Sequence, residues 1–211
     1  MGTAKETVRV GVVSDTHCPE FLDRLPDRIG ELLSGVELIL HAGDVGSAET
    51  LAELGRIAPV AAVRGDHDRG LDLPERRVVE VAGRQIGLVH GNRSHLIEEP
   101  ATFAGTVTLG RWWPKVGLYR WLRGSFPDVD AVVYGHTHFA DSRRLDGTLL
   151  LNPGAVYQVS PAEARRRLER NPGWFEWSWL QVIRHRRVTP LPSVGLLEIG
   201  QSGITASILA L

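Results

Sequence analysis

Cysteine and long apolar runs are what this 211-residue chain has least of. Cys18 is the single cysteine, so no internal disulfide can form, and the composition fits a reducing compartment. No run approaches the roughly 18 apolar residues that a transmembrane helix needs, and residues 1–7 lack the apolar core of a signal peptide. These absences predict a cytoplasmic protein without a transmembrane segment.

The chain also lacks an excess of charge of one sign, since 24 Lys and Arg residues nearly balance 25 Asp and Glu residues and leave a formal net charge of −1. No overall field therefore attracts nucleic acid or an anionic membrane. Low-complexity segments are absent too, and 43% hydrophobic with 23% charged residues is the composition of a globular protein. A chain of 211 residues has the right size for one α/β domain.

The most informative stretch that is present is an apolar run that stops at two polar residues. Residues 8–13 read Val-Arg-Val-Gly-Val-Val, and β-branched residues in a run too short for a helix predict a buried strand. Asp15 and His17 follow at its carboxyl end, where α/β sheets place their ligands. A carboxylate and an imidazole suit Zn²⁺, Mn²⁺ or Fe, although an N-capping Asp and a packed His would give the same short pattern.

The same arrangement recurs twice in the first half of the chain. The two further runs are residues 36–42, before Gly43-Asp44, and residues 60–64, before Gly65-Asp66. Apolar residues at helical spacing predict helices over residues 20–34 and 47–55 between these strands. Strands that alternate with helices are typical of parallel βαβ units, so we expect three carboxyl ends at one edge of a sheet.

The second half of the chain changes to closely spaced strands. They are expected over residues 77–82, 85–90, 130–134, 147–152, 194–199 and 204–209. The first two and the last two are joined by short turns that contain glycine, which is typical of hairpins. The whole pattern predicts an α/β fold: a four-layer α-β-β-α sandwich in which two mixed β-sheets pack face to face with helices outside.

Seven side chains with metal-ligand chemistry directly follow five of these strands. They are Asp15, His17, Asp44, Asp66, His90, His136 and His138. Packed core histidines would not be distributed so regularly, so the pattern favours a metal site. The ordered motifs Asp-x-His, Gly-Asp, Gly-Asp-His-Asp, a single His and Gly-His-x-His resemble those of the calcineurin-like metallophosphoesterases over residues 8–154. The terminal hairpin is similar to that of the family's small bacterial and archaeal phosphodiesterase branch.

The resemblance implies a binuclear metal centre that hydrolyses phosphoesters. It implies a first cation held by Asp15, His17, Asp44 and His138, and a second held by Asp44, Asp66, His90 and His136. Mn²⁺ is the expected metal, with Fe, Zn²⁺ or Ni²⁺ as alternatives, and a hydroxide that bridges the two divalent ions would attack phosphorus in line. The resemblance also implies that His67 assists the leaving oxygen and that Asp68 orients His67.

Asp66 departs from the family pattern, which has Asn at this position. A carboxylate adds a negative charge, which should tighten metal binding and reduce the Lewis acidity left for the substrate. The substitution therefore bears on rate and metal preference more than on the existence of the site.

Several other arginines and histidines are candidates for roles near the site. Arg64 and Arg93 lie beside metal motifs and are candidates for substrate binding through a phosphate, or they simply pair with acidic neighbours. His41 is expected to pack behind the site, His95 either reaches substrate or is solvated, and His185 is expected at the surface.

The predicted function is a metal-dependent phosphoric ester hydrolase acting on a small-molecule phosphoester, with phosphodiesters preferred over monoesters. The diester preference rests on the resemblance alone. The alternative is a non-catalytic metal-binding scaffold of the same fold that binds protein partners, as one small family member does in the retromer. His67 and the seven ligand positions are chemically competent, which favours the enzyme. Nucleic-acid cleavage has little support in so short a chain, and a homodimer stays open.

The six tryptophans lie in two basic segments outside these motifs, at about residues 110–124 and 161–187. The first contains Trp112, Trp113 and Trp121, and the second contains Trp174, Trp177 and Trp179. We expect both segments to be insertions into a single metallophosphoesterase domain over residues 1–211. Either they pack together as a closed aromatic lobe, or they offer aromatic and cationic surface to a substrate, a partner subunit or a membrane interface.

Overall fold

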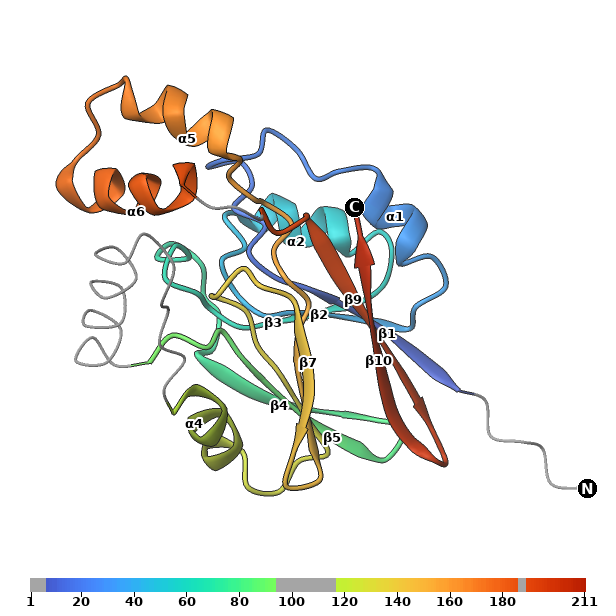
Figure 1. The fold of residues 1–211 in the computed structure, drawn as a ribbon. Coiled ribbons are helices and arrows are strands. Elements are labelled where there is room, and N and C mark those ends of the chain that lie inside the picture. The colour runs from blue at the N-terminus through green and yellow to red at the C-terminus, as the bar shows by residue number, and fades with distance from the viewer. Residues whose placement is uncertain (1–6, 94–116, 186–188) are drawn as a thin grey trace, which may run out of the picture. The chain divides into compact units, whose positions relative to one another are not determined.

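The computed structural model describes residues 7–93, 117–185 and 189–211, and the chain divides into two compact units. The first unit consists of Met1–Gly91, Tyr119–Tyr157 and Leu191–Leu211, and the second of Asn92–Leu118 and Gln158–Pro190. Both β-sheets belong to the first unit, and Figure 1 draws their strands as arrows. The second unit contains the helices α5 (Pro161–Leu168) and α6 (Trp174–Arg184).

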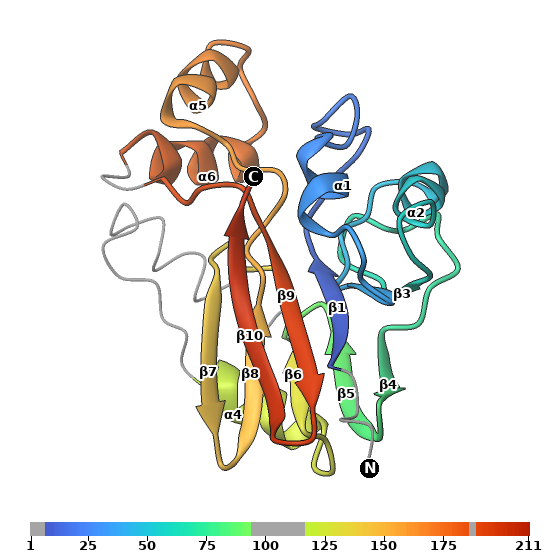
Figure 2. The same ribbon diagram turned by 90° about the vertical axis from the view of Figure 1, so that its right-hand side faces the viewer.

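The first sheet has five strands in the order β10-β9-β1-β2-β3 (Figure 2). Its parallel part consists of β1 (Val8–Val13), β2 (Leu38–His41) and β3 (Val60–Ala62), with Val10 of β1 opposite Leu38 of β2. The terminal hairpin of β9 (Ser193–Gly200) and β10 (Gly203–Ala210) pairs antiparallel with the other edge of β1. The predicted parallel order of the first three strands and the terminal hairpin are both confirmed.

The second sheet has the order β4-β5-β6-β8-β7. Its strands are β4 (Arg76–Val81), β5 (Arg84–Val89), β6 (Ala131–Val133), β8 (Thr148–Asn152) and β7 (Asp141–Leu145). The inner strands β5, β6 and β8 are parallel, and β4 and β7 are antiparallel edge strands. The sequence did not predict β7, because its Asp-Ser-Arg-Arg-Leu sequence has no buried residue and no apolar alternation.

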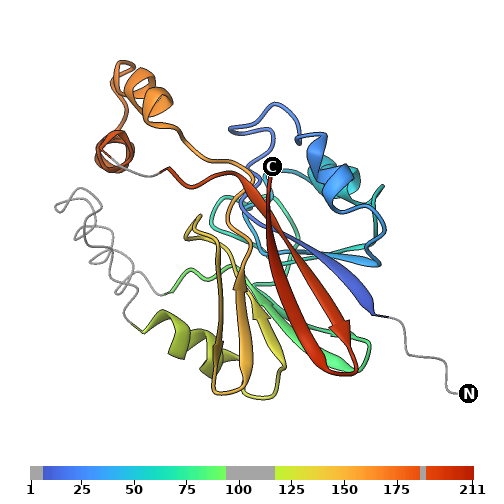
Figure 3. The same ribbon diagram turned by 45° about the vertical axis from the view of Figure 1, so that its right-hand side comes forward.

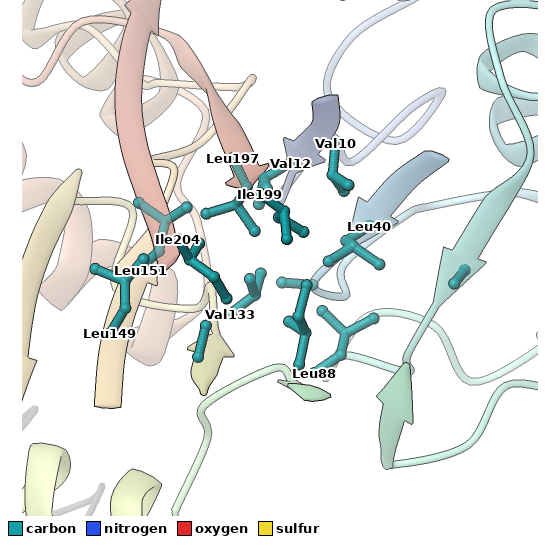
Figure 4. Close-up of a cluster of buried hydrophobic side chains, with 14 of the residues drawn as sticks. Val10, Val12, Leu40, Leu88, Val133, Leu149, Leu151, Leu197, Ile199 and Ile204 are labelled. Carbon is teal, nitrogen blue, oxygen red and sulfur yellow. The ribbon is translucent and has the colours of Figure 1, made fainter. Parts of the chain in front are cut away.

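The main hydrophobic core lies between the two sheets (Figure 4). The first sheet contributes Val10, Val12, Leu40, Leu197 and Ile199, and the second contributes Leu88, Val133, Leu149 and Leu151. Alternate residues of β1 point to opposite faces, so Val10 and Val12 enter this core while Val13 packs on the other face. The predicted face-to-face packing of two mixed sheets is therefore confirmed.

Helices cover the outer faces of both sheets, as Figure 3 shows with α1 and α2 in blue to cyan and α4 in olive. The helices α1 (Arg28–Leu32) and α2 (Ala48–Leu54) pack on the first sheet through a second apolar cluster that includes Ile29, Leu33 and Leu54. Helix α4 (Leu118–Ser125) covers the second sheet, where the ring of Phe126 lies 2.7 Å from the position of a Cβ on Gly87 in β5. The result is the predicted α-β-β-α sandwich.

Two helix predictions had different outcomes. Helix α2 begins after Ser47, whose hydroxyl accepts the backbone N–H of Thr50 at 3.2 Å, as the predicted N-cap should. The helix predicted over residues 20–34 is wrong for its first part, because only Arg28–Leu32 is helical. Pro26 explains the late start, since the residue before a proline is disfavoured in the α region. Among the described residues, no helix is long and apolar enough to cross a bilayer.

Candidate metal centre

The carboxyl ends of strands from both sheets carry the predicted ligands. Asp15 and His17 follow β1, Asp44 follows β2, and Asp66 follows β3 in the first sheet, while His90 follows β5 and His136 and His138 follow β6 in the second. The loops are bonded directly to one another, because backbone N–H groups of Asp15 and His17 each donate to a carbonyl after β2 at 3.0 Å. Gly135 N–H likewise donates to the carbonyl of His90 at 2.8 Å.

Five of these residues have a left-handed backbone conformation. Their φ angles are 53° at Asp15, 48° at His17, 54° at Asp44, 65° at His136 and 58° at His138. Residues other than glycine rarely adopt positive φ, and such strain clusters at functional sites where the surrounding structure holds it. The strained backbone is therefore concentrated in the loops that carry the predicted ligands.

Two glycines leave room for the carboxylates. A Cβ on Gly65 would overlap the carboxylate and backbone N of Asp44, and a Cβ on Gly135 would overlap the hydroxyl of Ser14 and come 2.8 Å from an Asp15 oxygen. Both glycines precede a predicted ligand in the sequence. They allow the backbone of one loop to lie directly against the ligand of another.

The first group of ligand atoms comes from Asp15, His17 and His138, and these atoms lie within 4.8 Å of one another. An Asp15 oxygen is 3.4 Å from Nε2 of His138. Asp15 is fully buried, and burial raises its pKa, but the charge and hydrogen bond of His138 outweigh burial and lower the pKa to about 2. Asp15 is therefore an ionised carboxylate at neutral pH.

The second group comes from Asp66, His90 and His136, again within 4.8 Å of one another. Oδ2 of Asp66 is 3.3 Å from Nδ1 of His136 and 3.9 Å from Nε2 of His90. The hydrogen bond from His136 lowers the pKa of Asp66 against the opposing effect of burial. The carboxylate that departs from the family pattern thus lies with the two histidines that the prediction assigned to the same cation.

Asp44 lies between the two groups. Its Oδ2 is 3.6 Å from Nε2 of His17 and 3.3 Å from Nε2 of His90, while its Oδ1 accepts the backbone N–H of His67 at 2.9 Å. Burial raises the pKa of Asp44, but His90 and His17 together hold it well below its usual range. One carboxylate oxygen therefore faces a histidine of each group.

His90 shows that this donor set fits a cation. Its Nδ1 is 2.8 Å from the carbonyl of Ala42, and because a carbonyl can only accept, the ring hydrogen is on Nδ1. In the neutral ring Nε2 presents a lone pair towards the oxygens of Asp44 and Asp66, and within the described residues this buried atom has no hydrogen-bond partner. Burial lowers the pKa of His90, but Asp44 outweighs burial and raises it, so positive charge is favoured there. Nitrogen and carboxylate donors that converge in this way suit divalent metals, because a cation can take the place of the proton that Asp44 favours on His90.

The carboxylate of Asp68 does not face the ring of His67, although the sequence predicted that it would. The carboxylate of Asp68 is buried and accepts backbone N–H groups of Val45, Gly46 and Gly65 at 2.8, 3.0 and 2.8 Å. In the described part of the chain, no hydrogen bond joins it to the His67 ring. Asp68 fixes the loops after β2 and β3 instead, and the prediction that it orients His67 is corrected on this geometry.

Glu20 takes the place that the sequence assigned to Asp68. Its Oε2 is 3.0 Å from Nδ1 of His67, and both side chains are 43% exposed. Sequence reasoning missed Glu20 because it was assigned to a helix rather than to a strand end. Its position three residues after His17 is the signal that could have drawn attention to it.

His41 has the packing role that the sequence favoured. Its fully buried ring accepts the N–H of Gly43 at Nδ1, 3.2 Å away, and its Nε2 is 3.1 Å from the hydroxyl of Thr16. Burial lowers the pKa of His41 to about 4. A neutral imidazole therefore joins the two loops that carry Asp15, His17 and Asp44.

The structure bears differently on each residue considered for substrate binding or for the surface. The guanidinium of Arg64 donates to Glu75 at 2.7 Å, which is the acidic-neighbour alternative. Arg93 belongs to the second unit, and its contact with substrate stays a prediction. His95 lies outside the described residues, and His185 is an exposed residue at the end of α6 that accepts from Arg184 at 2.9 Å.

The described tryptophans are partly open to solvent. Trp174 is 75% exposed and Trp177 is 41% exposed, and their rings stack at 5.6 Å. Arg167 lies over the ring of Trp179 at 5.7 Å. Trp112 and Trp113 lie outside the described residues, so the expected contact between the two insertions stays a prediction.

The sequence of the chain matches a known family. The profile described as "Calcineurin-like phosphoesterase superfamily domain" matches residues 8–167. A protein from Methanothermobacter thermautotrophicus named "Probable metallophosphoesterase" is 35% identical over 148 residues, which are 69% of this chain and 76% of that protein. The chain belongs to the calcineurin-like phosphoesterase superfamily, as its motifs predicted, and the family supports a phosphoesterase hydrolase.

Solved structures share its fold. Vacuolar Protein Sorting 29 from Cryptosporidium parvum has a TM-score of 0.63 and 22% identity, and the match covers 98% of this chain and 99% of that one. An archaeal phosphodiesterase has a TM-score of 0.55 and 19% identity, with coverage of 96% and 100%. At these identities the matches show the two-sheet fold.

Proposed function

We propose that this chain is a phosphodiesterase that depends on two divalent cations. The observation that carries the proposal is the position of Asp44 Oδ2, at 3.6 Å from Nε2 of His17 and 3.3 Å from the buried Nε2 of His90. A carboxylate between two histidine-containing groups suits a pair of cations that share one bridging ligand.

Each cation has its own ligand set in this proposal. The first set is Asp15, His17, Asp44 and His138, and the second is Asp44, Asp66, His90 and His136. When bound, the cations supply Lewis acidity that polarises a phosphate and activates a water. Mn²⁺ is the proposed metal, because both sets contain carboxylates, which suit Mn²⁺, while the imidazoles leave Fe, Zn²⁺ or Ni²⁺ as alternatives.

His67 is the proposed acid for the leaving group. Its backbone N–H is bonded to Asp44, which holds the residue beside the metal ligands, and its Nδ1 faces Glu20. Nε2 is therefore the ring nitrogen available to donate a proton. The attacking water first loses a proton to solvent. As its oxygen forms a bond to phosphorus, the bond from phosphorus to the leaving oxygen breaks, and that oxygen takes the proton from Nε2, which solvent then restores.

The preference for diesters over monoesters is the most specific part of the proposal. It is supported by the archaeal phosphodiesterase that shares the fold, and by the family's small branch that the sequence resembles. The competing function is a scaffold for protein partners, which the fold shared with Vacuolar Protein Sorting 29 brings into consideration. His67 and the convergent ligands favour the enzyme, because a scaffold does not need a proton donor beside its metal residues.

The test is hydrolysis by protein that has been stripped with a chelator and reloaded with Mn²⁺. We expect metal-dependent release of nitrophenol from bis(p-nitrophenyl) phosphate, with slower release from p-nitrophenyl phosphate. His67→Ala should cost about 10²–10⁴ in rate on a diester with an alkyl leaving group and much less with nitrophenolate, which needs little protonation. His185→Ala is the matched control, since it removes an exposed histidine of the second unit. Faster monoester hydrolysis would refute the diester preference, and no metal-dependent hydrolysis of either ester would refute the enzyme.

A further inference from the structure

We propose that Glu20 is a positioning residue whose single carboxylate holds the rings of both His17 and His67. The inference rests on the proposed metal centre, in which His17 binds a cation and His67 donates a proton. It concerns a residue outside the motifs that define the family match.

The geometry puts both rings on one carboxylate. Oε2 and Oε1 of Glu20 are 3.0 and 3.3 Å from Nδ1 of His67, and Oε2 is 3.8 Å from Nδ1 of His17. The two rings are 4.8 Å apart at nearly perpendicular planes. Glu20 therefore lies at the junction between a proposed ligand and the proposed acid.

His17 has a reason to use this carboxylate. The residue is 2% exposed, its Nε2 faces Asp44, and in the described chain its buried Nδ1 has no hydrogen-bond partner. A histidine that binds metal through one nitrogen usually donates its other N–H to a carboxylate, a carbonyl or water. Oε2 of Glu20 is the carboxylate oxygen nearby, and a shift of about 1 Å brings the pair to hydrogen-bond distance.

His67 gains orientation from the same group. A carboxylate that accepts Nδ1–H forms a charge-assisted hydrogen bond. This contact directs the opposite edge of the ring, with Nε2, away from Glu20. Loss of Glu20 therefore leaves the proton donor present but free to rotate.

The loop brings Glu20 back over His17. The N–H of Phe21 donates to the carbonyl of His17 at 2.8 Å, which closes a turn around Glu20, and the ring of Phe21 stacks on Tyr157 at 5.1 Å. The hydroxyl of Thr50 holds the carbonyl of Cys18 at 2.8 Å. The backbone on both sides of Glu20 is thus anchored, although its side chain is 43% exposed.

The same three side chains could instead hold a cation of their own. Ligand atoms of His17, Glu20 and His67 lie within 4.8 Å of one another, and two histidines with one glutamate form a ligand set that zinc accepts. A cation there would occupy Nδ1 of both rings. Metal stoichiometry therefore separates a hydrogen-bonding role from a ligand role.

The experiment compares Glu20→Ala and Glu20→Gln with Asp23→Ala, which removes an exposed carboxylate from the same loop. Calorimetric titration of metal-free protein with Mn²⁺ should show an unchanged number of sites in all variants. Affinity at one site should fall about 10- to 100-fold in Glu20→Ala, which is the typical effect of losing such a partner. Glu20→Gln keeps an acceptor oxygen and should recover part of the loss.

Kinetics give the second readout. At saturating Mn²⁺, where the weaker metal binding is offset, Glu20→Ala should lower kcat on an alkyl diester more than on a nitrophenyl diester, and it should add no further loss to His67→Ala in the double variant. Equal affinity and kcat in Glu20→Ala and Asp23→Ala would overturn the proposal, and so would the loss of one equivalent of Mn²⁺ or Zn²⁺ with Glu20. An inactive wild type would refute the phosphodiesterase, while the affinity comparison would still decide the role of Glu20 beside His17.

Discussion

Acid should destabilise the metal-free protein through His41. This ring is fully buried, and its Nδ1 accepts the backbone N–H of Gly43, so the neutral form is the one that fits. Burial lowers the pKa from 6.5 to about 4. Between these two values the unfolded chain binds a proton that the folded chain excludes. The free energy of unfolding therefore falls as the pH falls from about 6.5, and the loss is complete below about pH 4.

The size of the effect follows from the two pKa values. The difference between 6.5 and about 4, at about 1.4 kcal/mol for each pH unit, gives about 3 kcal/mol in full. About 2 kcal/mol of this is lost between pH 7 and pH 5. Asp15 acts in a separate window, because its lowered pKa of about 2 stabilises the fold above about pH 4, and that stabilisation is lost only as the pH falls towards 2.

Urea unfolding in the presence of a chelator, followed by tryptophan fluorescence, measures this. The wild type should lose about 2 kcal/mol more than His41→Gln between pH 7 and pH 5, whatever the stability of the variant at pH 7. His185→Gln removes an exposed histidine and should follow the wild type. Parallel pH dependence in the wild type and His41→Gln would refute the reasoning.

Three further predictions address the metal site, the tryptophans and the core. Asp66→Asn removes one negative charge from the second ligand group, so calorimetry should detect weaker Mn²⁺ binding at one site with the fold retained, and identical affinities would argue against Asp66 as a ligand. Acrylamide should quench part of the tryptophan fluorescence, because Trp174 is 75% exposed; a wholly protected signal in dilute protein would contradict that exposure. Leu40→Ala empties a fully buried position between the sheets and should cost about 2–5 kcal/mol in urea unfolding, and a loss below about 1 kcal/mol would contradict the packing.

The sheets and the convergence of the proposed ligands could be predicted because they depend on local patterns. Short β-branched runs such as residues 8–13 identify buried strands without knowledge of their neighbours. A polar residue directly after such a run is carried to the carboxyl edge, so Asp15, Asp44 and His90 came together although they are far apart in the sequence. The glycines beside them also have local causes, since they allow close contact between loops.

Side-chain partners could not be predicted in the same way. Glu20 and His67 are 47 positions apart, and their contact depends on a turn at His17 that no strand pattern reveals. Asp68 could contact either a neighbouring imidazole or backbone N–H groups, and only the packed loops decide for the backbone. The polar edge strand β7 was missed because an edge needs no buried side chains.

The central claim is that Asp44 is shared by two cations, and metal stoichiometry tests it most directly. Protein loaded with Mn²⁺ and then dialysed should contain about two equivalents per chain, as two ligand sets require. Asp44→Ala should lose both cations, and His90→Ala chiefly one, in samples whose circular dichroism matches the wild type. Equal Mn²⁺ content in the wild type and Asp44→Ala would contradict the account.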